Sequence, residues 1–176
     1  MDYAIFSTPM GWMVIAGSSE GIAHVVLPVC NPHLALKRVF LQAKRSPGEM
    51  QKLTPSRFGT LPERLIAFLQ GEQISFPDRL DRRDWTGFRS RVWDATRLIP
   101  YGETRSYGWV AATAGQPLAC RAAGQALHHN PVPIIVPCHR VIGANGSLTG
   151  FGSGLAIKQL LLSIESGQQH TSVDMV

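Results

Sequence analysis

Long apolar runs are missing from this sequence, and so is a leader-like start. No stretch approaches the roughly 20 apolar residues that a membrane-spanning helix needs. The first residues, Met1 to Ala4, lack the basic start and the apolar run of a signal peptide. We therefore expect a cytoplasmic protein that has no membrane partner.

Cysteine is scarce, with three residues at irregular spacing: Cys30, Cys120 and Cys138. An odd number argues against a disulfide framework and fits reduced thiols in a reducing compartment. The sequence has no Cys-x-x-Cys pair, the strongest sign of zinc. His24, Cys30 and His33 lie close together and could bind zinc, but no fourth ligand stands at a convincing spacing. We predict no metal and no cofactor.

Charged residues are also few, at 16%, and they leave a formal net charge of +5. The 44% of hydrophobic residues makes a disordered chain implausible, and 176 residues suffice for one compact core or two small subdomains. A basic balance suits a polyanionic partner such as nucleic acid. The excess is modest, however, and ribosomal and membrane-surface proteins share it.

The N-terminal part of the chain has the pattern of a small sheet with helices. Asn31 can cap a helix that has Pro32 at its first position, and Gly71 can end a second helix. Met10, Trp12 and Cys30 are assigned to the core of this part. Short apolar runs separated by turn residues predict strands over 2–7, 12–16 and 22–27. The other expected features are a helix over 32–40, a polar loop over 44–54, a helix over 61–70 and a charged connector over 78–84.

The C-terminal part is mostly helical in its pattern. Apolar residues at helical spacing predict helices over 87–98, 107–114, 118–127 and 155–165. The second and third are short and joined by a tight turn at Gly115, which makes them a helix-turn-helix candidate. Many helical hairpins share this pattern. The polar residues 168–176 are expected to form a disordered tail.

Cys138 and His139 are adjacent, which is the minimum for an activated thiol. The thiolate is the nucleophile, and a base or a positive neighbour must favour it. Prolines at 131, 133 and 137 stiffen the approach, and the apolar run 134–136 should bury it. A lone cysteine is more often a small core residue. A rigid, half-buried cysteine beside a base is a costly arrangement unless it reacts.

At this point the sequence resembles the O6-alkylguanine-DNA alkyltransferase family. Pro137-Cys138-His139-Arg140-Val141 is similar to the active-site signature of that family. Other motifs match in the same order, so the resemblance is strong from Phe88 to Glu165 and looser before it. These motifs are residues 99–104, 106–107, 121–124 and 130–133, together with Gly146, Gly150 and the helix through Leu161 to Glu165.

The resemblance implies a catalytic group of four residues. Cys138 would accept the alkyl group from O6 of guanine irreversibly, in a single-turnover, suicide reaction. His139 would deprotonate it through a bound water, and Glu165 would orient His139. Tyr107 would rotate the nucleotide's phosphate and donate a proton to N3 of the leaving guanine. Without the family, Glu165 reads as a surface acid at a helix end and Tyr107 as an amphipathic aromatic.

The resemblance also implies how alkylated double-stranded DNA would be bound. Arg121 would fill the gap that the flipped base leaves, and the helix that carries it would lie in the minor groove. The residues expected against DNA are Arg121, Tyr107, Ala122, Ala123 and Gly124. The alanines could equally be packed in the core. The base pocket is expected to consist of Asn130, Pro133, Val141, Phe151, Gly152 and Ser153. Asn130 would also brace the active-site turn, and Phe151 would stack on the guanine.

The fold that the resemblance implies is α+β. A small N-terminal β-sheet-plus-helix domain, ribonuclease H-like and with its connector spanning 1–84, would precede a C-terminal domain over 85–167. That second domain would be mostly helical, with a winged-helix-like helix-turn-helix. The protein would act as a monomer, associated with the nucleoid in a bacterium, and O4-alkylthymine is a further possible substrate.

Three other classes of protein compete with this interpretation. An alkyltransferase-like binding protein carries tryptophan in place of Cys138. A helix-turn-helix regulator would not need the Pro-Cys-His-Arg motif or Glu165. A cysteine hydrolase would need an oxyanion hole and would turn over many times.

Overall fold

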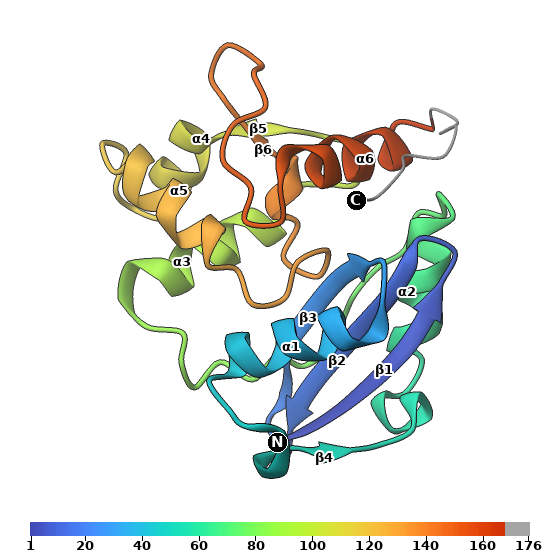
Figure 1. Ribbon diagram of the computed structural model, residues 1–176. Coiled ribbons are helices and arrows are strands. Elements are labelled where there is room, and N and C mark those ends of the chain that lie inside the picture. Colours follow the sequence, from blue (N-terminus) through green and yellow to red (C-terminus); the bar gives the residue numbers. More distant parts are fainter. Residues whose placement is uncertain (168–176) are drawn as a thin grey trace. The chain divides into compact units, whose positions relative to one another are not determined.

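The computed structural model describes residues 1–167, and the tail expected over 168–176 lies outside them. These residues form two compact units (Figure 1). Unit 1 spans Met1–Arg82, and unit 2 begins at Arg83. Unit 1 holds a sheet with helices, whereas unit 2 is mostly helical. The α+β class is therefore as predicted. No helix within residues 1–167 is long and apolar enough to cross a bilayer.

The sheet of unit 1 has four strands in the order β3-β2-β1-β4. β1 (Asp2–Thr8), β2 (Gly11–Ser18) and β3 (Gly21–Val29) form an antiparallel meander, as the apolar runs predicted. Its first turn requires glycine, since Gly11 has a φ of 117° and a Cβ there would lie 2.5 Å from the carbonyl oxygen of Val29.

The expected loop over 44–54 is only partly a loop. It holds a 3₁₀ turn, Pro47–Glu49, and a short strand, β4 (Gln51–Lys52), that pairs in parallel with β1. The backbone N–H of Leu53 donates to the carbonyl of Tyr3 at 2.8 Å. The sequence did not indicate this strand, because two residues at a sheet edge are too short to show a periodic pattern.

Helix α1 (Pro32–Ala43) packs on one face of this sheet. It begins where predicted, because Oδ1 of Asn31 accepts from the backbone N–H of Leu34 at 2.8 Å. The assignment of Cys30 to the core was wrong, since its side chain is exposed directly before α1. Met10 and Trp12 are half-buried. The hydrophobic core that α1 forms with the sheet contains these buried residues: Tyr3, Val14, Ala16, Val26, Val29, Ala35, Val39 and Met50.

Helix α2 (Leu61–Leu69) follows a 3₁₀ turn at Pro55–Phe58 and lies in the predicted place. Its apolar side is fully buried at Leu61, Leu65 and Phe68. Residues 70–82 then lead out of unit 1, and Asp81 is bound there by the hydroxyl of Ser18 at 2.7 Å. The charged connector therefore contributes contacts to unit 1 as well as linking the two halves.

Unit 2 contains four helices and one small sheet within the described residues. Three helices, α3 (Gly87–Arg97), α4 (Tyr107–Thr113) and α5 (Cys120–His128), pack on one another. The fourth, α6 (Leu155–Glu165), has the predicted bounds. The sheet is a parallel pair of two-residue strands, β5 (Arg105–Ser106) and β6 (Val141–Ile142), which sequence patterns did not indicate.

Helices α4 and α5 form the predicted helix-turn-helix candidate. The hydroxyl of Ser106 caps α4 by accepting from the N–H of Trp109 at 3.1 Å. Helix α5 begins two residues later than predicted, because Ala119 closes a turn onto the carbonyl of Gln116. Leu118 is consequently 98% exposed. The winged-helix detail stays a prediction, since the sheet found in unit 2 up to residue 167 is the parallel pair alone.

Candidate active site

A rigid turn carries the candidate nucleophile at its end. The side-chain Nδ2 of Asn130 donates to the carbonyl of Val136 at 2.8 Å and to Sγ of Cys138 at 3.0 Å. Its Oδ1 accepts from the N–H of Val132 at 3.1 Å. Ile134 is buried with a φ of 74°, an unfavourable conformation for a β-branched residue. The turn is thus held by side-chain hydrogen bonds on the inside and by close packing.

Cys138 starts the 3₁₀ turn Cys138–Arg140 (η3), and it is only 5% exposed. Burial raises the pKa of its thiol to about 11, although the hydrogen bond from Asn130 and the charge of Lys158 act to lower it. The resting side chain is therefore a thiol at neutral pH. A nearby group must remove its proton when it reacts.

His139, the residue after Cys138, forms a buried pair with Glu165. Nε2 of His139 and Oε1 of Glu165 are 2.8 Å apart, and both side chains are almost fully buried. Burial lowers the pKa of His139, while Glu165 partly opposes this shift. Burial alone would raise the pKa of Glu165, but hydrogen bonds from His139 and Arg140 outweigh it and lower that pKa to about 2. An ionised Glu165 can only accept, so Nε2 carries the ring proton and Nδ1 is left as the basic nitrogen.

Arg140 completes the charge balance of this pair. Its guanidinium donates to both carboxylate oxygens of Glu165, at 2.8 to 3.1 Å, and to the carbonyl of Ile99 at 2.6 Å. The ring of Tyr101 lies 5.7 Å from the guanidinium carbon, and the N–H of Gly102 donates to Oε2 of Glu165 at 3.0 Å. The motif at 99–102 therefore cradles the buried ion pair.

Tyr107 and Lys158 lie together, and both are close enough to Cys138 to interact with its charge. The hydroxyl of Tyr107 donates to the carbonyl of Thr149 at 2.7 Å and accepts from Nζ of Lys158 at 3.4 Å. Lys158 also donates to the carbonyls of Val141 and Thr149, at 2.6 and 2.9 Å. Burial lowers the pKa of Lys158 and raises that of Tyr107. Three oxygen acceptors nevertheless match an ammonium group.

The glycine-rich loop over 143–154 is placed against α5. A Cβ added to Gly152 would lie 2.8 Å from the carbonyl oxygen of His128, so the two backbones touch. The ring of Tyr107 contacts Gly124, where an added Cβ would be 3.7 Å away. Phe151 and Ser153 are half-buried on this loop, while Pro133 is buried in the active-site turn. The loop, α4 and α5 are thus brought together around Tyr107.

The residues predicted to contact DNA differ in exposure along α5. Arg121 and Ala122 are exposed, Gly124 is half-buried, and Ala123 is fully buried against the core. Arg121 forms no hydrogen bond or ion pair with any of residues 1–167, so its guanidinium is available to a ligand. The alanines are therefore divided between surface and core, as the sequence left open.

Two functional candidates were missed in the sequence, Arg140 as an ion-pair partner and Lys158. The signal for Lys158 is its position on α6, three residues before Leu161 and seven before Glu165, on the buried face of the helix. A lysine at a core position has to have polar partners. Zinc was a separate question: within residues 1–167, no group of three or more His, Cys, Asp and Glu side chains is arranged to hold a metal ion.

Known proteins resemble this chain in sequence. Residues 87–167 match the family model described as 6-O-methylguanine DNA methyltransferase, DNA binding domain. The chain is also 42% identical to the methylated-DNA–protein-cysteine methyltransferase of Methanosarcina acetivorans over 165 residues, which cover 94% of this chain and 98% of that protein. The chain belongs to the methylated-DNA–protein-cysteine methyltransferase family.

Other relatives agree over nearly the whole length. The methylated-DNA–protein-cysteine methyltransferase of Mycolicibacterium paratuberculosis is 39% identical over 175 residues, or 99% of this chain and 98% of that protein. A crystal structure of Mycobacterium tuberculosis OGT in complex with DNA superposes with a TM-score of 0.77 at 37% identity, covering 95% of this chain and 94% of that one. The predicted family, fold class and enzyme class, a methylated-DNA–protein-cysteine S-methyltransferase, are thereby confirmed.

Proposed function

We propose that this protein repairs DNA by moving an alkyl group from O6 of guanine in duplex DNA to Sγ of Cys138. The observation that carries the proposal is the buried His139–Glu165 pair, joined at 2.8 Å, with His139 next in sequence to the buried Cys138. The nucleophile and the base are adjacent residues, and the carboxylate is hydrogen-bonded to the base. Thiol-transfer chemistry needs these three groups. The DNA-bound relative supports DNA as the partner.

The first step is activation of the thiol. Nδ1 of His139 takes the proton of Cys138 through a bound water, and the negative charge of Glu165 stabilises the imidazolium that forms. The sulfur then attacks the alkyl carbon, a carbon–sulfur bond forms, and the bond from that carbon to O6 breaks. The raised pKa of Cys138 supports a mechanism in which deprotonation accompanies substrate binding.

The second requirement is a proton for the leaving guanine. Tyr107 donates its hydroxyl proton to N3, which neutralises the charge that develops on the base. Lys158 lies 3.4 Å from the hydroxyl oxygen and stabilises the phenolate that remains. The hydroxyl must leave the carbonyl of Thr149 for this step, so binding of the base is coupled to a small local rearrangement.

The burial of Cys138 supports base flipping. Cys138 is only 5% exposed, so its sulfur cannot reach O6 of a base inside the stack, and the nucleotide has to leave the helix. Arg121, exposed on α5, fills the gap from the minor groove, and Ala122 and Gly124 let the helix approach the backbone. In the pocket, Phe151 stacks on the base. The carbonyl of Val141, which also accepts from Lys158, reads the edge of the base with backbone groups near Gly152.

The reaction is stoichiometric and irreversible. Its product is a thioether, and the proposed site supplies no step that would break it. We further propose that the protein acts as a monomer and accepts O4-alkylthymine as a secondary substrate. The proposed domain bounds are 1–84 and 85–167.

Mass spectrometry of the protein after incubation with O6-methylguanine duplex tests the proposal. The peptide that contains Cys138 should gain one methyl group, and product should stop at one equivalent of protein. Label on Cys30 or Cys120 would place the acceptor elsewhere, and repeated turnover would favour a hydrolase. An intact, unmodified protein that still binds the lesion would favour a binding protein.

A further inference from the structure

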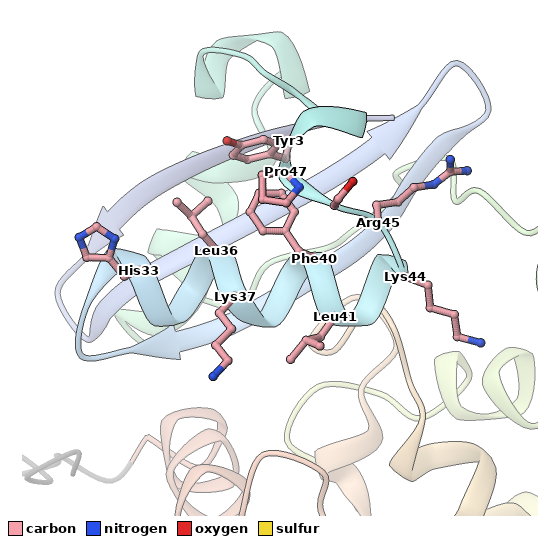
Figure 2. Close-up of a pocket in the computed structure, with 10 residues that line it drawn as sticks. Tyr3, His33, Leu36, Lys37, Phe40, Leu41, Lys44, Arg45 and Pro47 are labelled. Carbon is pink, nitrogen blue, oxygen red and sulfur yellow. The ribbon is translucent and has the colours of Figure 1, made fainter.

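Unit 1 carries an open groove along α1 that the methyl-transfer reaction does not use. The groove has a volume of about 910 Å³. Figure 2 shows Leu36 and Phe40 pointing from α1 toward Tyr3 and Pro47. These four side chains form the apolar floor of the groove. The rings of Tyr3 and Phe40 meet edge to face, with centroids 5.4 Å apart. Leu41, which also lines the groove, is 68% exposed. We call this surface the α1 groove.

The rim of the α1 groove is basic. Lys37, Lys44 and Arg45 line it, and no Asp or Glu occurs anywhere from residue 31 to residue 48. The next carboxylate in the sequence, Glu49, accepts from the N–H of Ser46 at 2.7 Å and lies 3.9 Å from Arg45. Lys37 and Lys44 form no ion pair with any side chain in residues 1–167. Two cations therefore flank an exposed apolar surface and have no counter-charge among residues 1–167.

We propose that the α1 groove binds an acidic segment of another protein, one that carries apolar side chains between its Asp and Glu residues. The apolar side chains would cover Leu36, Phe40 and Leu41, and the carboxylates would meet Lys37 and Lys44. Lys37 lies on α1 and Lys44 directly follows its last residue, so the two positions are about two turns, or 10 Å, apart along the helix axis. An amphipathic helix with acids two turns apart matches that spacing.

Charge complementarity distinguishes this occupant from a second copy of the chain. The densest acidic stretch in the chain is Asp78 to Asp84, and three arginines interrupt it. Asp78 is already bound by Arg64 at 2.6 Å, and Asp81 by Ser18 at 2.7 Å. A second copy would thus bring a neutral stretch to a basic groove. DNA would satisfy the lysines but would leave the leucine and phenylalanine floor without an apolar partner.

Binding of a synthetic probe to the full chain tests the proposal. The probe is a fluorescein-labelled helical peptide in which leucine and phenylalanine alternate with pairs of aspartate. Its binding is measured by fluorescence anisotropy. Two control peptides replace either every aspartate by asparagine or every apolar residue by serine. The parent peptide should bind more tightly than both, and added salt should weaken it.

Matched variants locate the site. Lys37→Glu should weaken the peptide by about threefold to tenfold, whereas Lys52→Glu, the same change outside the groove, should not. Leu41→Ser should weaken it by about threefold. Leu98 lies outside the groove and is exposed to nearly the same extent as Leu41, at 66%. Leu98→Ser should therefore leave peptide binding unchanged. Methyl transfer should be normal in all four proteins, which reports that each is folded.

Three results would overturn the proposal. The first is equal binding of the parent peptide and either control peptide. The second is an equal loss in Lys37→Glu and Lys52→Glu, or in Leu41→Ser and Leu98→Ser. The third is a different occupant: undamaged duplex DNA that loses affinity in Lys37→Glu alone would assign the groove to nucleic acid, and self-association abolished by that change would assign it to a second copy.

Discussion

Units 1 and 2 bury different kinds of side chain. Within residues 1–167, unit 1 is closed by aliphatic and aromatic residues, and Asp81 is the buried charge found in it. Unit 2 buries four ionisable residues, His139, Arg140, Lys158 and Glu165, around a buried cysteine. Each of these groups has a hydrogen-bonding partner of fitting chemistry. Buried charge is costly to a fold, and such groups cluster at functional sites, so their concentration in unit 2 indicates that the site lies there.

The comparison is sharpest at the cysteines. Cys138→Ala should abolish methyl transfer completely, because the proposed acceptor atom is gone. Affinity for an alkylated duplex should stay within about twofold, since the proposed binding surface is α5 with Arg121. Cys30→Ala in unit 1 and Cys120→Ala on α5 are the controls and should transfer normally. Transfer and binding are measured on the same duplex. A loss of binding equal to the loss of transfer would mean that Cys138 has a structural role.

Carboxylates give the next largest difference. Glu165→Gln should lower the free energy of unfolding by about 3 to 5 kcal/mol, because it leaves Arg140 buried without a counter-charge. Glu20→Gln, at the exposed pair with Arg79, should cost at most about 1 kcal/mol. Urea denaturation of both variants measures this. Similar values for the two would remove the distinction between the units.

The same carboxylate sets an acid limit. The pKa of Glu165 is about 2 in the folded protein, below its ordinary 4.5. Its contribution is therefore complete above pH 4.5 and is lost as the pH falls from 4.5 toward 2, by up to about 3 kcal/mol. Wild-type stability should fall through this window, and Glu165→Gln should fall less steeply.

Arg121→Ala should slow repair of duplex DNA by a few kcal/mol of barrier, roughly the energy of unstacking one base step, and should spare reaction with free O6-benzylguanine. Arg97→Ala, exposed at the end of α3, removes the same charge from unit 2 and is the control. Rates are compared on duplex, single-stranded and free-base substrates at several salt concentrations. Equal losses on single and double strands that recover at low salt would reduce Arg121 to a phosphate contact.

The smallest expected effect lies in the pocket wall. Gly152→Ala would bring a methyl group within 2.8 Å of the His128 carbonyl, so the loop must shift. We expect a loss of about 1 to 3 kcal/mol in stability and a slower transfer of bulky alkyl groups. Gly48→Ala in unit 1 has open space around it and should be neutral. Thermal unfolding and rates with O6-methyl and O6-benzyl substrates report both effects.

Local signals explain what could be predicted from the sequence. Caps at Asn31 and Ser106 and the apolar face of 155–165 are short-range features, and those helices lie where they were expected. The pairing of β4 with β1, and of β5 with β6, depends on residues far apart in sequence, so no local pattern indicated it. Cys30 was misplaced because free cysteine is usually buried, whereas this one lies exposed between the last residue of β3 and the cap of α1.

The site divides in the same way. The Cys138–His139 adjacency was visible, and so was the presence of an acid at the end of the last helix. The ion pair of Arg140 with Glu165 was not, because a one-dimensional motif does not show that two charges 25 residues apart are buried together. Lys158 could have been noticed from its place on a buried helix face, whereas its three acceptors come from separate segments.

One carboxylate joins three separate segments of unit 2. Glu165 on α6 binds Gly102 from the turn after α3 and both His139 and Arg140 from η3. If α6 detaches, all three segments lose their connection at once. Unit 2 therefore opens around this site as one cooperative block, and slow amide hydrogen exchange should show one shared protection for these segments. In a partly folded form of this unit, His139, the proposed base, would no longer be held in position by Glu165.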